Sequence, residues 1–99
     1  MAHLPATVKQ LDDQISSQED KGMVLVLREA IIYLIQEDRL SDSDTVTSRT
    51  LEEIRQAIYE TNDSSKKGRG AEGVFIAMMS LTGNPVEAAL QYIEGLSRQ

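Results

Sequence analysis

Apolar residues recur at intervals of three and four along most of this chain, the spacing of one helix face. In the first segment they are Leu4, Val8, Leu11 and Ile15. Pro5 fits a first helical turn, where a missing N–H is harmless. The polar run 16–22 ends the segment. The pattern predicts an amphipathic helix near the N-terminal end of the chain.

The stretch from about 23 to 38 is apolar on nearly every side, with eleven apolar residues and the charged pair Arg28 and Glu29 in its middle. Its β-branched residues would also suit a strand, but its length and the charged pair favour a helix. A helix that is apolar all round is normally buried all round. We therefore expect this helix to be central, with Arg28 and Glu29 either pairing across an interface or marking a narrow wet strip.

A polar linker, residues 41–47, precedes a third predicted helix. Thr50 and Glu53 have the spacing of a capping box, in which Thr50 caps the backbone and Glu53 reaches back to it. The inner stripe of this helix is Leu51, Ile54 and Ile58, with Tyr59 as a further candidate. Asn, Asp, Ser and Gly residues in 62–70 break the pattern.

Helical spacing resumes over 71–82, where Phe75, Met78 and Met79 form either part of the core or a soft binding face. Asn84 then begins a last helix as its cap, with Pro85 in the first position and an acidic residue three after the cap. The apolar face of this helix consists of Val86, Ala89, Leu90, Ile93 and Leu96.

Together these segments predict an all-α fold. We expect a compact bundle of four to five short helices around the central apolar helix (about 23–38), forming a single domain over 1–99. Four short amphipathic helices leave part of an all-apolar helix uncovered. This leftover surface favours a homodimer over a fully wrapped monomer.

The composition of the chain argues against several classes of function. The 99 residues carry a net charge of −6, which repels nucleic-acid phosphates and anionic membranes. There is no Cys, and His3 is the only histidine, so nucleophilic and general-base catalysis lack their usual residues. We expect no enzyme activity and no cofactor. The most apolar run is too short to span a membrane and no secretory signal precedes it, which together favour a cytoplasmic location.

Two charged segments are candidates for contacts with a protein partner. The basic loop contains Lys66, Lys67 and Arg69, which could meet an acidic partner or a phosphate. The acidic linker contains Asp38, Asp42 and Asp44.

A calcium loop would fit the twelve positions from Asp42 to Glu53, but Val46 and Thr47 occupy its fifth and sixth positions. Those positions need a side-chain oxygen and a glycine. The sequence therefore predicts no metal site there.

These features predict a small acidic regulatory or adaptor protein that acts by binding another protein. One alternative is an inhibitor that presents acids in place of nucleic-acid phosphates, since residues 36–63 hold eight acids and three arginines, a net of 3 − 8 = −5. Another is a DNA-binding regulator that uses Arg49 and Arg55, although three glutamates share their helix.

The order of features between about 24 and 81 resembles the small enterobacterial biofilm-regulatory and two-component connector proteins. The matching residues are Leu27, Ala30, Leu34, the polar stretch 38–43, Ile54, Ile58, Glu60, Thr61 and Asp63. The resemblance implies a helical, dimeric protein that makes regulatory contacts with proteins or DNA. This chain departs from that pattern by adding helices at both ends and by placing Gly68 and Gly70 before the fourth segment.

The tail from 81 to 90 is similar to the last loop and helix of ubiquitin-associated domains. It lacks the Met-Gly-Phe type of loop that those domains carry before their second helix.

Overall fold

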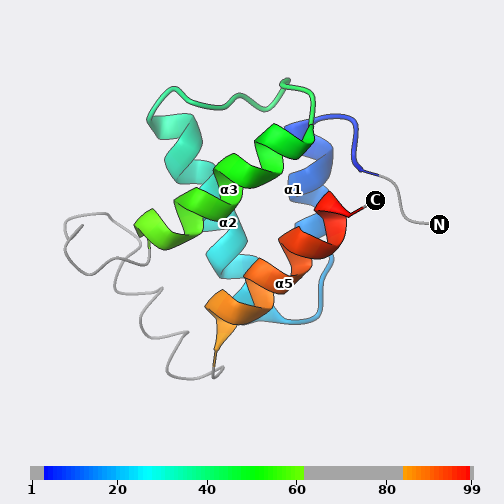
Figure 1. The fold of residues 1–99 in the computed structure, drawn as a ribbon, viewed down its shortest axis with the longest axis vertical. Helices are drawn as coiled ribbons and strands as arrows, with labels where there is room; N and C mark the ends of the chain where they lie inside the picture. Colours follow the sequence, from blue (N-terminus) through cyan, green and yellow to red (C-terminus); the bar gives the residue numbers. More distant parts are fainter. Residues whose placement is uncertain (1–3, 62–83, 99) are drawn as a thin grey trace.

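The computed structural model describes residues 4–61 and 84–98, and four helices lie in these two ranges (Figure 1). They are α1 (Val8–Ser16), α2 (Lys21–Gln36), α3 (Ser48–Thr61) and α5 (Pro85–Ser97). The predicted all-α class is confirmed. The predicted helix over 71–82 and the basic loop before it lie outside the described residues.

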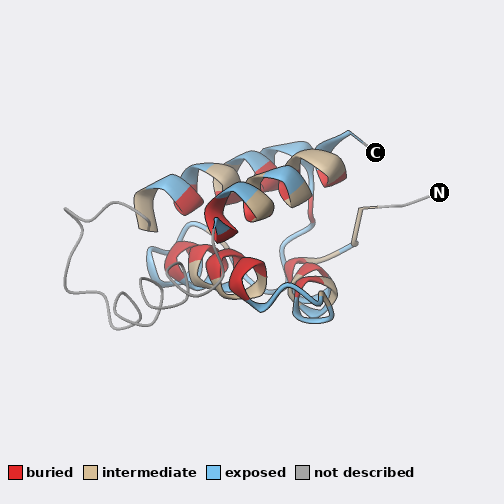
Figure 2. Ribbon diagram, turned by 90° about the horizontal axis from the view of Figure 1, so that it is seen from below, coloured by how far each residue is buried: buried red, intermediate tan, exposed pale blue. Residues whose placement is uncertain are grey.

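The helices are arranged in two layers, with α3 and α5 side by side over α1 and α2 (Figure 2). The buried residues lie mainly on the sides of the helices that face the other layer (Figure 2). Helix α2 packs against each of the other three helices, as expected for a central helix. Only one side of α2 faces these neighbours, however, because the two-layer arrangement places nothing from the described residues below it.

The core between the layers is aliphatic, as expected from the scarcity of aromatic residues. Each of its large members contributes on the order of 1.5–3 kcal/mol by leaving water. The fully buried large side chains are Val8, Leu11, Ile15, Val26, Leu27, Leu34, Leu51, Ile54, Ile58, Pro85 and Ile93. The predicted inner positions of α3 and most of those of α5 belong to this core.

The outer side of α2 contradicts the prediction that this helix is buried all round. Ile32 is 40% exposed and Ile35 38% exposed, while Val24 and Leu25 are only partly buried. Tyr59 on α3 is also exposed. The sequence pattern could not separate the two sides of α2 because both carry aliphatic residues.

Helix caps account for most of the helix boundaries. Asp20 accepts a hydrogen bond from the Met23 N–H at 3.0 Å, so α2 begins two residues before the predicted start. Asn84 accepts from the Glu87 N–H at 3.2 Å, which confirms the predicted start of α5. Helix α1 begins at Val8 after the cap Thr7, so Pro5 precedes the helix.

The predicted cap of α3 is wrong. Thr47 is the cap: its hydroxyl accepts from the Thr50 N–H at 3.2 Å, and the Thr50 hydroxyl accepts from the Thr47 N–H at 3.1 Å. Thr50 is thus the third residue after the cap, and it makes the reciprocal hydrogen bond that the prediction assigned to Glu53. A threonine can take that place because its hydroxyl also accepts a backbone hydrogen bond. Glu53 binds Arg39 instead.

None of the helices within 4–61 and 84–98 is both long enough and apolar enough to cross a membrane.

Candidate functional site

The segment between α2 and α3, residues 37–47, is the α2–α3 linker, and backbone hydrogen bonds attach it to the start of α1. The Val8 N–H donates to the Asp44 carbonyl at 3.0 Å, and the Lys9 N–H donates to the Asp42 carbonyl at 3.1 Å. The Val46 N–H in turn donates to the Ala6 carbonyl at 3.0 Å. The first N–H groups of a helix have no partner within the helix. The linker supplies those partners, and its own position is thereby fixed.

Asp38 occupies a structural position at the end of α2. Its φ of 59° lies in the left-handed region. The Asp38 N–H donates to the Ile35 carbonyl at 3.1 Å, and the Arg39 N–H donates to the Leu34 carbonyl at 2.9 Å. This pair of hydrogen bonds is a Schellman motif, in which the left-handed residue is usually glycine. Asp38 therefore ends the helix with an exposed carboxylate.

Four exposed carboxylates lie along the linker, and none forms an ion pair with the rest of the described chain. Asp44 accepts a hydrogen bond from the Ser41 N–H at 2.9 Å, which orients its side chain. The four are Glu37, Asp38, Asp42 and Asp44. Within residues 4–61 and 84–98, no cation therefore compensates these four charges of the linker.

The one cation of the linker, Arg39, is already engaged. Its guanidinium donates to Glu53 at 2.8 Å and to Glu60 at 3.3 Å, and it lies 6.0 Å from the centre of the Tyr33 ring. The Tyr33 hydroxyl also donates to Glu60 at 3.3 Å. The hydrogen bond that Arg39 donates to Glu53 raises the pKa of Arg39. Arg39 thus ties the end of α2 to α3 and neutralises two acids of α3.

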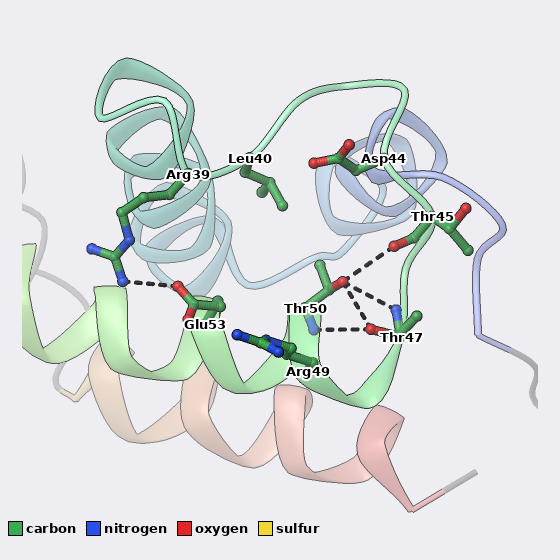
Figure 3. A pocket seen from close by; sticks show the side chains of 8 residues that line it. All are labelled: Arg39, Leu40, Asp44, Thr45, Thr47, Arg49, Thr50 and Glu53. Carbon is green, nitrogen blue, oxygen red and sulfur yellow. Dashed lines mark hydrogen bonds and ion pairs between the residues drawn. The ribbon is translucent and has the colours of Figure 1, made fainter.

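A hollow of about 420 Å³ opens between the linker and the start of α3 (Figure 3). Its lining is mostly polar, with two arginines, two acids, three threonines and one leucine. Small-molecule pockets of this size are usually lined by apolar side chains. The lining of this hollow therefore differs from that of a typical small-molecule pocket. The lining residues are Arg39, Leu40, Asp44, Thr45, Thr47, Arg49, Thr50 and Glu53.

The threonines hold the wall of the hollow in one conformation. Besides the reciprocal bonds with Thr47, the Thr50 hydroxyl lies 3.2 Å from the Thr45 carbonyl and donates to it (Figure 3). Thr50 is buried, whereas Thr45 and Thr47 are exposed.

The structure brings together only part of the predicted site. Asp44 lines the hollow, Asp42 lies exposed on the linker beside it, and Asp38 ends α2. Lys66, Lys67 and Arg69 lie outside the described residues. The sequence analysis did not predict the hollow because the residues around it come together only in the folded chain. Arg39, for example, pairs with Glu53 and Glu60, which lie 14 and 21 residues further along the sequence. The spacing of Glu53 and Glu60 on one face of α3 was the available signal.

The arginines considered for DNA binding have different surroundings. Arg55 lies 3.7 Å from Glu52 and 4.0 Å from Glu94, and its guanidinium sits 5.9 Å from the centre of the Tyr59 ring. Arg49 lines the hollow and has no ion pair within the described ranges.

The twelve positions from Asp42 to Glu53 do not form one loop, since α3 already begins at Ser48. Across the described residues, no group of three or more metal-ligating side chains comes together.

No protein family, curated protein or solved structure matches this chain.

Proposed function

We propose that this protein is a small acidic regulator or adaptor that binds a basic segment of a partner protein at the α2–α3 linker. It does so in the cytoplasm and as a homodimer. A Lys or Arg of the partner would pair with Asp44 at the edge of the hollow, while the other linker carboxylates meet further cations. Electrostatic complementarity of this kind raises the association rate and selects the partner.

The observation that carries this proposal is that the charges of Glu37 and Asp38 bring no gain to the described fold. Glu37 and Asp38 lie at the C-terminal end of α2, where the helix dipole is negative and the last turn contains no basic residue. An acid there costs about 0.3–1 kcal/mol. Asp38 also occupies a left-handed position that glycine fills better. Residues that break local rules without a structural gain are expected at functional sites.

The attachment of the linker to α1 supports the same reading. A loop whose carbonyls bind Val8 and Lys9 loses little conformational freedom when a partner docks. Affinity gained by preorganisation does not require a large interface.

The test is a pull-down with the tagged protein from source-cell lysate, at low and high salt, with bound proteins identified by mass spectrometry. The variant Asp38→Asn/Asp42→Asn/Asp44→Asn neutralises the linker without changing side-chain shape. One stoichiometric protein held by the wild type and lost by the variant is the expected result. A partner that binds both equally would refute the role of the linker.

The matched control is Asp13→Asn/Glu19→Gln, which removes two exposed acids from α1 and the turn after it. It should retain the partner. The identity and salt dependence of the partner separate the alternative functions. A nucleic-acid enzyme lost steeply as salt rises would favour phosphate mimicry over the adaptor. A gel shift with duplex DNA at moderate salt would favour the DNA-binding regulator.

A further inference from the structure

Arg49 differs from the other arginines of the described chain because no acid pairs with it. Each of the other four lies within 4.0 Å of a carboxylate, although three of those carboxylates are at least one-third exposed. These four are Arg28, Arg39, Arg55 and Arg98. The molecule carries a net charge of −6, so acids are abundant, and Arg49 is exposed. Within residues 4–61 and 84–98, the charge of Arg49 is nevertheless uncompensated.

The ion pairs of α3 explain why Arg49 has no partner. Glu52 and Glu53 lie three and four residues after Arg49, the spacing at which opposite charges on one helix can pair. Glu52 instead lies 3.7 Å from Arg55, and Glu53 accepts from Arg39 at 2.8 Å. Both acids within reach of Arg49 along α3 are thus held by other arginines.

Arg49 also lies where a helix disfavours a cation. It is the second residue of α3, and the first turn of this helix contains no acid. The helix dipole is positive at this end, so a cation there is unfavourable. Asp38 breaks the corresponding rule at the end of α2, where the dipole is negative. The α2–α3 linker therefore has an unpaired carboxylate at one end and an unpaired guanidinium at the other.

The hollow brings Arg49 together with an acid of the linker. Asp44 lines the hollow from the linker, and Arg49 lines it from the first turn of α3 (Figure 3). Neither forms an ion pair among the described residues. The other two charged residues of the lining, Arg39 and Glu53, pair with each other. The hollow thus presents one unpaired charge of each sign.

We propose that the partner segment bound at the α2–α3 linker carries an acidic side chain as well as its cations, and that this carboxylate pairs with Arg49. A carboxylate matches the planar fork of a guanidinium and can accept two hydrogen bonds from it. A phosphate would bring roughly two negative charges to a linker with four unpaired acids, whereas the carboxylate brings one and arrives with the cations of its segment. This inference rests on the function proposed above and specifies the charge pattern of the partner.

Peptide titrations of the isotope-labelled full chain, followed by NMR, test the proposal. The probes are short acetylated and amidated peptides of alternating Lys and Gly, in which each Gly in turn is replaced by Glu. A second set carries Gln in place of Glu. Moving the Glu along the peptide samples each register against Arg49. Shifts of the backbone amide signals of residues 37–49 locate the bound peptide and give its Kd.

Comparing Glu and Gln peptides in two proteins isolates the contact with Arg49. At the best position, the Kd of the Gln peptide divided by that of the Glu peptide should fall by about two- to fivefold from the wild type to Arg49→Gln, the range of an exposed ion pair. Arg98→Gln is the matched control, because it removes an exposed arginine that does not line the hollow. It should keep the wild-type ratio. The amide spectrum of each variant also shows whether its fold is intact.

The outcomes separate this inference from the proposed function. The peptide without Glu should bind the wild type, and it should bind Asp38→Asn/Asp42→Asn/Asp44→Asn more weakly. If it does so while the ratio is the same in Arg49→Gln and the wild type at every position, the pairing with Arg49 is overturned and the linker acids keep their role. A wild type that binds none of the peptides overturns both. A free C-terminal carboxylate that binds more tightly than every internal Glu would overturn the side-chain assignment.

Discussion

Replacing Asp38 by glycine separates the structural role of this position from the role in partner binding that we propose for it. Asp38 ends α2 with φ 59°, and its carboxylate lies at the negative end of the helix dipole. Glycine adopts the left-handed conformation without steric cost, whereas alanine does not. Asparagine tolerates the conformation and removes only the charge.

The magnitude follows from these differences. Removing the carboxylate should raise the free energy of unfolding by about 0.3–1 kcal/mol in the Gly, Ala and Asn variants alike. Because glycine adopts the left-handed conformation more easily, Asp38→Gly should have a free energy of unfolding about 1 kcal/mol higher than Asp38→Ala. The greater freedom of glycine in the unfolded chain reduces this difference. We expect the stability order Gly, then Asn, then wild type, with Ala at or below wild type. For a chain of 99 residues, 1 kcal/mol corresponds to roughly 4–8 °C in Tm.

Urea unfolding followed by circular dichroism measures these differences at neutral pH, with the m-value as a check that the folded state is unchanged. Asp38→Ala as stable as Asp38→Gly would refute the left-handed assignment. Partner binding provides the contrast, since Asp38→Gly and Asp38→Asn should weaken it to a similar extent despite their different stabilities.

Four other predictions concern the fold. Leu27→Ala should cost about 2–5 kcal/mol in urea unfolding because Leu27 is fully buried, and a loss under 1 kcal/mol would contradict its place in the core. Arg39→Ala should cost about 1 kcal/mol, most of which should vanish in 1 M salt since its ion pairs are partly exposed. Asn84→Ala should cost about 1 kcal/mol through the lost cap, and Asn84→Asp should not. Because burial raises the pKa of Glu29 above its usual 4.5, the ionised form opposes folding at neutral pH. At protein concentrations too low for association, Glu29→Gln should raise Tm at pH 7. This gain in Tm should shrink as the pH falls through the raised pKa of Glu29. It should be absent below pH 4.5, where Glu29 of the wild type is protonated.

Local spacing in the sequence was enough to predict the four described helices and most of the described core. The intervals between Leu51, Ile54 and Ile58 placed all three on the buried side of α3. Asn84 marked the start of α5 because a cap bonds to the backbone three residues away. The start of α3 was missed by three residues, since two threonines at Thr47 and Thr50 cap each other as well as a threonine and a glutamate do.

The exposed side of α2 and the places where charged residues meet depend on how the helices pack in three dimensions. Helix α2 carries aliphatic residues on every side, so the exposure of Ile32 and Ile35 depends on where its neighbours pack. The same holds for Arg39, whose two partners on α3 come within reach only after α2 and α3 have packed. Asp42 and Asp44 were identified from composition, but their fixed position comes from carbonyls that bind the start of α1. Hydrogen bonds between distant segments depend on how the chain is arranged in space. The local spacing of apolar and polar residues does not contain that information.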